Sequence, residues 1–255
     1  MKKILLFIGL LVASIFVLFV MKKPSPHSNN SDYPVLLVGT NAEYKPFCFI
    51  ENGEIVGFDI DVIKEIAKRM HKQIVIKDLS FDALLPELQL GNLHVVAAGM
   101  TPTEKRGKIV LFSKSHFEGE GFVLYVNHGS PITRFEDLQG KTVAVNEGYS
   151  ADTYISQFSD INVLRLSAAS VAEGLLALQS GRADAFIVAK SAIKPILQGE
   201  AGKQYDSIAI PDTFEASAFA ISKHHAHLLP LIDREIDSMK KDGTLKELVK
   251  KWDIS

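Results

Sequence analysis

The chain has 255 residues, of which 47% are hydrophobic and 23% charged, and its formal net charge is −2. These values indicate a globular protein long enough for one large or two moderate domains, and without a basic excess there is no reason to expect nucleic acid as a partner. Cys48 is the only cysteine, which excludes an internal disulfide and a cysteine-based metal cluster.

Residues 1–32 are predicted to be an export segment followed by a tether. Two lysines precede an apolar run over residues 4–21, which is the pattern of a signal peptide. The run is about as long as a bilayer-spanning helix, and no small-residue cleavage site follows it. We therefore expect either a cleaved signal peptide or a retained membrane anchor, and then a flexible tether over residues 24–31. Either form places the rest of the chain in the periplasm or another extracytoplasmic space.

From residue 35 onward, apolar runs of strand length alternate with segments of helical spacing. The expected elements of the first part are a strand at 35–38, a hairpin at 49–56, a helix at 57–70, a strand at 74–76, a helix at 81–88 and a strand at 93–98. A second unit is expected to contain strands at 122–126, 142–145, 163–166, 185–188 and 208–210, with helical segments at 135–138, after 148 and at 171–178. A strand at 219–221 and helices at 228–239 and 245–252 complete the chain. This alternation indicates an α/β fold with mostly parallel sheets, in two units with a ligand cleft between them.

Residues 99–106 have the composition of an anion-binding loop. Gly99 follows an apolar strand and lets the backbone approach a ligand, and Thr101 adds a hydroxyl. Thr103 then starts a helical turn whose free N–H groups favour negative charge, and the planar guanidinium of Arg106 can hold a carboxylate through two hydrogen bonds. The alternative is an ordinary helix cap with a surface arginine or a structural salt bridge.

No catalytic, phosphate-binding or dinucleotide-binding motif is present in the sequence. The histidines at 224, 225 and 227 are the one cluster that resembles metal ligands, but they lie in a polar link before a helix, without an acidic or cysteine partner nearby. We therefore expect no catalytic residue, no metal and no cofactor.

Four stretches together carry a resemblance to a known family. They are Tyr44–Phe47, Gly57–Val62, Thr101–Arg106 and Gly181–Ala185. In this order and spacing, the chain resembles the periplasmic amino-acid-binding proteins of ABC importers, solute-binding protein family 3, over about residues 33–255, with most likeness to the arginine and basic-amino-acid binders. The resemblance implies a type II periplasmic-binding-protein fold. Lobe 1 would comprise residues 33–121 and 217–255, lobe 2 residues 122–216, and two hinge crossovers would join them.

The resemblance also implies roles for individual residues. Arg106 would bind the ligand α-carboxylate with help from Thr101 and Ser150, and the Gly99 carbonyl would accept from the α-ammonium. Tyr44 and Phe81 would sandwich the ligand side chain, and the alternative is that both are core aromatics. The ligand-binding candidates are Asn41, Glu43, Tyr44, Phe81, Gly99, Met100, Thr101, Arg106, Glu118, Ser150 and Glu215.

One position departs from the family pattern. Family members usually carry an acid that pairs with the α-ammonium where this chain has Ala189, and Glu215 is our candidate substitute. Asn41, Glu43, Glu118 and Glu120 are candidates to neutralise a cationic side chain, although for the glutamates a solvated surface position is an equal alternative.

The resemblance thus implies a monomeric binding protein that captures a free L-amino acid, with arginine favoured, and delivers it to an ABC permease in the inner membrane. The alternative is an enzyme on the same fold, such as a cyclohexadienyl dehydratase, because fold alone does not exclude chemistry. A sensor domain of a receptor is less favoured, since no second apolar span follows in the sequence.

Overall fold

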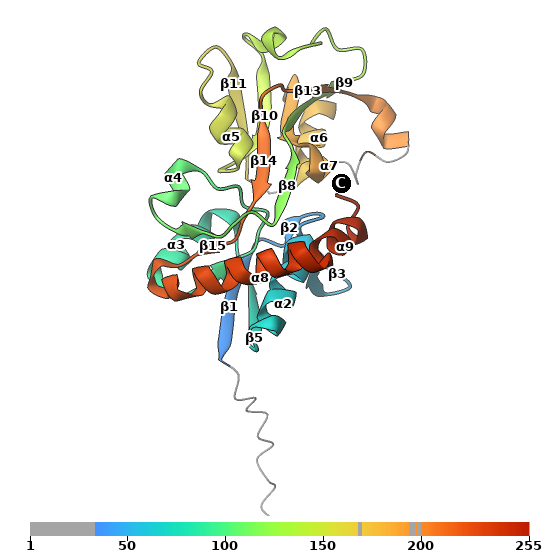
Figure 1. Cartoon of the computed structure of the whole chain (residues 1–255). Coiled ribbons are helices and arrows are strands. Elements are labelled where there is room, and N and C mark those ends of the chain that lie inside the picture. The colour runs from blue at the N-terminus through green and yellow to red at the C-terminus, as the bar shows by residue number, and fades with distance from the viewer. Residues whose placement is uncertain (1–33, 168–169, 194–196, 198–199, 255) are drawn as a thin grey trace, which may run out of the picture. The chain divides into compact units, whose positions relative to one another are not determined.

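The computed structural model describes residues 34–167, 170–193, 197 and 200–254 (Figure 1). Residues Pro34–Ser255 form one compact unit. The predicted export segment and tether lie outside the described residues. Within the described part of the chain, no helix is both long enough and apolar enough to cross a membrane.

The first sheet has five strands in the order β5-β1-β6-β15-β7. Strand β1 (Val35–Thr40) pairs in parallel with β5 (Gln73–Asp78) and β6 (Val95–Val96). Strand β15 (Ala220–Ile221) runs antiparallel between β6 and β7 (Leu111–Phe112), so the C-terminal part of the chain returns to complete this sheet.

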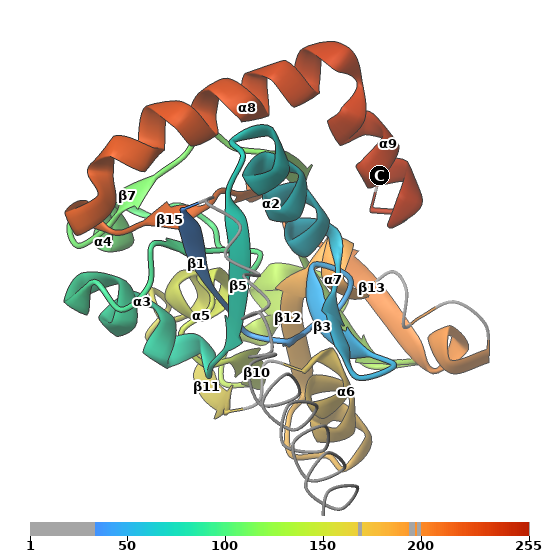
Figure 2. The same ribbon diagram turned by 90° about the horizontal axis from the view of Figure 1, so that it is seen from below.

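Helices cover both faces of the first sheet. Helix α2 (Phe58–Arg69) and helix α8 (Leu229–Asp242) lie on one face and α3 (Phe81–Leu90) on the other (Figure 2). Helix α2 buries Ile60, Ile63 and Ile66, as its apolar spacing predicts. Helix α3 ends at Gly91, whose left-handed φ of 81° suits glycine.

The second sheet has the order β11-β10-β12-β9-β13. Strand β10 (Thr142–Asn146) pairs in parallel with β11 (Asn162–Leu166) and β12 (Ala185–Ala189), while β9 (Phe122–Asn127) is antiparallel to β12 and β13 (Tyr205–Ala209). The remaining elements are β2 (Glu43–Tyr44), β3 (Cys48–Glu51), β4 (Glu54–Val56), α4 (Glu104–Gly107), η1 (Phe135–Leu138), α5 (Ser150–Ile155), α6 (Val171–Gln179), α7 (Lys190–Ile193), η2 (Glu200–Gln204), η3 (Lys223–Leu228) and α9 (Thr244–Lys251).

Two antiparallel segments connect the sheets. Strand β8 (Phe117–Glu120) pairs with β14 (Phe214–Ser217), with Gly119 opposite Glu215 (Figure 1). The predicted α/β fold with mostly parallel sheets is confirmed. Its division into two lobes that move about these segments stays a prediction.

The structure differs from the prediction in the length of one strand and in the start of one helix. The apolar run at 93–98 forms only a two-residue strand, β6, because its short antiparallel partner β15 pairs with Val95 and Val96 alone. The predicted helix at 228–239 is preceded by the 3₁₀ turn η3, and α8 begins at Leu229 with Pro230 in its first turn, where a missing N–H is tolerated.

Candidate functional site

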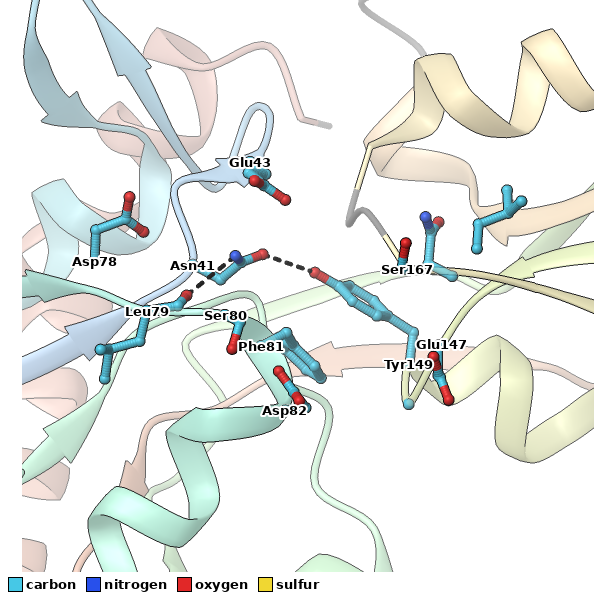
Figure 3. Close-up of a pocket in the computed structure, with 13 residues that line it drawn as sticks. Asn41, Glu43, Asp78, Leu79, Ser80, Phe81, Asp82, Glu147, Tyr149 and Ser167 are labelled. Atoms are coloured by element: carbon cyan, nitrogen blue, oxygen red, sulfur yellow. Dashed lines mark hydrogen bonds between the residues drawn. The ribbon is translucent and has the colours of Figure 1, made fainter.

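A cavity of about 850 Å³ lies where strands of both sheets end. In α/β sheets, ligands bind beyond the carboxyl ends of the strands, and here the ends of β1, β5, β10 and β11 meet at one place. The lining residues are Asn41, Glu43, Asp78, Leu79, Ser80, Phe81, Asp82, Asn146, Glu147, Gly148, Tyr149, Leu166 and Ser167 (Figure 3).

The lining of this cavity is acidic. Glu43, Asp78, Asp82 and Glu147 contribute carboxyl groups, and no lysine, arginine or histidine is among the described residues that line it. Asp78 also has a structural role, because its Oδ1 accepts a hydrogen bond of 2.8 Å from the Ala42 N–H. The charge of the lining favours a cationic ligand group.

Asn41 is held at the centre of the cavity wall and is 5% exposed. Its Nδ2 donates to the Leu79 carbonyl at 3.2 Å, and its Oδ1 accepts from the Tyr149 hydroxyl at 3.4 Å (Figure 3). Asn41 therefore connects the loop after β1 with the loop after β10.

Three aromatic rings meet beside Asn41. Tyr149 stacks on Phe81 with ring centroids 4.2 Å apart and meets Tyr44 edge-on at 5.4 Å. Tyr44 is only 7% exposed, and its other neighbour is Phe47, stacked at 5.2 Å. Tyr44 and Phe81 thus both contact the ring of Tyr149, which sequence reasoning did not select. Burial raises the pKa of the Tyr44 and Tyr149 hydroxyls well above the ordinary value, so both are neutral donors.

Arg106 is the buried cation of the predicted anion loop. It lies in α4, whose cap Thr103 accepts the Arg106 N–H at 3.2 Å, as the ordinary-cap alternative described. The guanidinium is not on the surface, however, because the residue is 8% exposed. Its Nη1 donates to the Thr101 carbonyl at 2.7 Å and its Nη2 to the Gly148 carbonyl at 2.9 Å. The guanidinium also lies 5.4 Å from the Phe81 ring centroid.

Among the described residues, no carboxylate forms an ion pair with Arg106. Burial lowers the pKa of its guanidinium, and the charge of Glu215 opposes that shift. An arginine remains protonated in proteins, so a buried positive charge sits here without a contacting counter-charge.

Glu215 lies in the same group, on β14, and is 8% exposed. Its Oε2 accepts from the Thr101 hydroxyl at 2.9 Å, and Ser150 also hydrogen-bonds its carboxyl group. Burial raises the pKa of Glu215, while these hydrogen bonds and the charge of Arg106 oppose the rise. The structure thus brings Thr101, Arg106, Ser150 and Glu215 together from segments far apart in the sequence.

Of the predicted residues, Asn41, Glu43 and Phe81 line the cavity, whereas Tyr44, Gly99, Met100, Thr101, Arg106, Glu118, Ser150 and Glu215 do not. Met100 is buried, and its carbonyl accepts from the Ala218 N–H. Gly99 donates its N–H to buried Asp59 at 2.7 Å. Glu118 is exposed on β8, as the surface alternative described. The Glu120 side chain lies outside the described residues.

Sequence reasoning missed most of the lining. Its members Asp78, Ser80, Asp82, Asn146, Glu147, Tyr149, Leu166 and Ser167 were not selected. Each lies at or just after the end of β5, β10 or β11, and the rule that ligands bind at the carboxyl ends of strands could have pointed to them.

The histidine cluster near η3 is separate from this site. His225 lies 4.1 Å from His94 between ring centroids, and the His94 Nδ1 accepts the Leu37 N–H. In the part of the chain that the structure describes, no three histidine, cysteine or acidic side chains are placed to hold a metal ion.

Comparison with known proteins gives consistent matches. The pattern of the bacterial extracellular solute-binding proteins, family 3, matches residues 36–254. The ABC transporter glutamine-binding protein GlnH of Bacillus subtilis (strain 168) is 35% identical over 208 residues, 79% of this chain and 74% of that protein. An ancestral arginine-binding protein, solved with arginine bound, has a TM-score of 0.78 and 34% identity, and the match covers 86% of this chain and 97% of the other.

A further solved structure bears on the enzyme alternative. It is an ancestral amino acid-binding protein described as a precursor of cyclohexadienyl dehydratase, with a TM-score of 0.76 and 32% identity. The match covers 86% of this chain and 95% of that protein.

Proposed function

The chain belongs to the bacterial extracellular solute-binding proteins, family 3, and we propose that it captures a free L-amino acid, arginine above the others, for an ABC permease in the inner membrane. In this proposal it acts as a monomer without catalysis. It is exported by residues 1–32, which serve as a cleaved signal peptide or remain as an anchor.

One observation carries the proposal: a buried arginine that forms no ion pair with any described residue adjoins an acid-lined cavity. The Arg106 guanidinium donates to the carbonyls of Thr101 and Gly148, and the residue has lost most of its hydration. A buried charge without a contacting counter-charge is costly, and the more distant charge of Glu215 offsets that cost only in part. A ligand carboxylate would add charge-assisted hydrogen bonds. This arrangement supports Arg106 as the carboxylate-binding residue.

The acidic lining of the cavity suits a cationic side chain. Its four carboxyl groups and the amide of Asn41 can accept hydrogen bonds from a guanidinium. The faces of Phe81 and Tyr44 add cation–π attraction of about 0.5–2 kcal/mol. These features support arginine over glutamine, the amino acid in the name of the Bacillus subtilis relative.

Glu215 is the group that we propose for the ligand α-ammonium. Ala189 lies in β12 and carries no charge, whereas Glu215 is buried beside Thr101 and Arg106. A carboxylate next to the carboxylate-binding arginine would let both charges of the amino-acid backbone be met within one cluster.

The dehydratase alternative has support from the similar ancestral precursor. Its substrates, prephenate and arogenate, carry carboxylates, which the four acids of the cavity would repel. Incubation of the protein with either compound, followed by assay for the aromatic product, tests this alternative. Product formation would overturn the non-catalytic assignment.

A thermal-shift screen of the twenty amino acids and ornithine tests the proposed function. A ligand at about 100 times its Kd adds roughly 2.7 kcal/mol to the free energy of unfolding. For a chain of this size that corresponds to a Tm increase of about 5–11 °C. We expect the largest increase with arginine. No shift with any amino acid would refute the proposal.

A further inference from the structure

The loop between β10 and α5 makes the contacts that a bound amino acid would be expected to make. Its Gly148 carbonyl accepts from the Arg106 Nη2 at 2.9 Å, and Arg106 is the residue to which our proposed function assigns the ligand carboxylate. An acceptor oxygen of the chain itself therefore already occupies one hydrogen-bonding position of the guanidinium.

The next residue of the loop, Tyr149, occupies the position beside Phe81 and Tyr44 that the proposed function gives to the ligand side chain. The Tyr149 ring stacks on Phe81 at 4.2 Å with an interplanar angle of 24°, and its edge meets Tyr44 at 5.4 Å. Both surfaces proposed for the ligand side chain are therefore covered by one residue. Figure 3 shows the ring reaching from its loop across the cavity toward Asn41.

The far end of the ring makes a polar contact as well. The Tyr149 hydroxyl donates to Asn41 Oδ1 at 3.4 Å, where the proposed function places the end of a guanidinium. Three successive groups of this segment, namely a carbonyl, a flat ring and a terminal donor, thus match the carboxylate, the planar side chain and the donor end of arginine.

We propose that Gly148–Tyr149 is an internal ligand, which an incoming amino acid must displace from Arg106, Phe81 and Asn41 before it can bind. This proposal rests on the proposed function, since it uses the same three contacts. Gly148 has a φ of 75° and no atom within 4 Å of a Cβ built there, and a glycine at this position has more accessible backbone conformations than any other residue. The Gly148 N–H donates to Asp152 Oδ2 at 3.0 Å and belongs to the preceding peptide unit. That bond can therefore persist while rotation about ψ of Gly148 turns its carbonyl away from Arg106 and the Tyr149 side chain leaves Phe81.

An internal ligand affects every external ligand by the same factor. The apparent Kd equals the intrinsic Kd divided by the fraction of molecules in which the site is free, and that fraction is a property of the unliganded protein. Removing the Tyr149 ring should therefore tighten arginine and lysine equally. A platform role predicts the opposite, namely weaker binding with a larger loss for arginine, whose flat guanidinium stacks on aromatic faces better than an ammonium.

Calorimetry on the full-length protein distinguishes the two roles. We expect Tyr149→Ala to bind both arginine and lysine about tenfold more tightly, a change of about 1.4 kcal/mol. The matched variant Tyr149→Phe keeps the stacked ring and loses only the hydroxyl, so it should recover most of the wild-type Kd. Unchanged or weaker arginine binding by a folded Tyr149→Ala protein would overturn the proposal.

A second measurement does not depend on the identity of the ligand. Because Tyr149 bridges residues of both sheets, its removal should increase the radius of gyration of the unliganded protein in small-angle scattering. If the wild-type protein binds no amino acid, the proposed function is refuted. The contact of Tyr149 with Phe81 and Asn41 is then tested only by the radius of gyration. An unchanged radius for Tyr149→Ala would refute it in that case.

Discussion

Replacing Arg106 by alanine removes the one buried guanidinium that the proposed function assigns to the ligand carboxylate. The side chain donates to two backbone carbonyls, at 2.7 and 2.9 Å, and contacts no carboxylate among the described residues. Its charge is therefore available to a ligand. Truncating one partner of a buried charge pair costs about 2–5 kcal/mol of binding free energy, so the Kd for arginine should rise roughly 30- to 4,000-fold.

The same substitution should leave the fold intact. Two charge-assisted hydrogen bonds are lost, each contributing about 1.5–3 kcal/mol, but relief of the desolvated guanidinium offsets much of that loss. We expect a net loss of roughly 1–2 kcal/mol of unfolding free energy, or about 2–8 °C in Tm.

Isothermal titration calorimetry with arginine measures the binding effect, and circular dichroism checks the fold. Arg134→Ala is the matched control. The Arg134 side chain is exposed to solvent, and it does not line the cavity. A folded Arg106→Ala protein whose Kd stays within about threefold of wild type would show that the carboxylate binds elsewhere.

Four other outcomes follow from the same structure. In competition binding, neither glutamine nor glutamate at equal concentration should displace arginine. The side-chain charge of glutamate would cost several kcal/mol beside the four cavity acids, and glutamine has no cationic group to bind them. Displacement of arginine by either one at equal concentration would contradict the electrostatic basis of specificity. Saturating arginine should reduce the radius of gyration in small-angle scattering as the sheets close about β8 and β14, and an unchanged radius would count against hinge closure unless the free protein is already closed. Burial raises the folded-state pKa of Glu215 above its ordinary value of 4.5, so the free energy of unfolding should fall as pH rises from 4.5 through the raised pKa. Urea unfolding of Glu215→Gln should lack this pH-dependent loss. If the unfolding free energies of both proteins changed in parallel with pH, the assignment would be disproved. Gly99→Ala should destabilise the protein by roughly 1–3 kcal/mol, because φ is 58° and a Cβ would lie 2.7 Å from the Tyr44 ring. Gly129→Ala is the control, since Gly129 has a φ of 76° in open space and measures the backbone cost alone. Equal losses of unfolding free energy in urea would show that the contact with Tyr44 is irrelevant.

The sequence by itself determined the fold class and part of the site. Periodicity reports which face of an element is buried, and so the apolar spacing of α2 and the runs at β1 and β10 were predictable residue by residue. Loop residues after a buried strand also indicate a site, because carboxyl ends of parallel strands collect at one edge of a sheet. Asn41, a candidate from the family resemblance, follows such a strand end and lies in the cavity wall, although its hydrogen bonds to Leu79 and Tyr149 were not predictable.

Only the tertiary structure decided how the two loop systems meet. The contact of Tyr149 with Asn41 joins residues 108 positions apart, and the Gly148 carbonyl meets a guanidinium 42 positions away. Neither contact can be predicted from the hydrophobic periodicity of the surrounding sequence. From its sequence, Arg106 could have been either an anion-binding residue or a surface charge, and its burial against Phe81 excludes the surface position. The hydrophobic periodicity of a segment indicates which of its faces is buried, but it does not indicate which other segment packs there. A site between two sheets depends on that packing, so it could not be predicted from the local sequence.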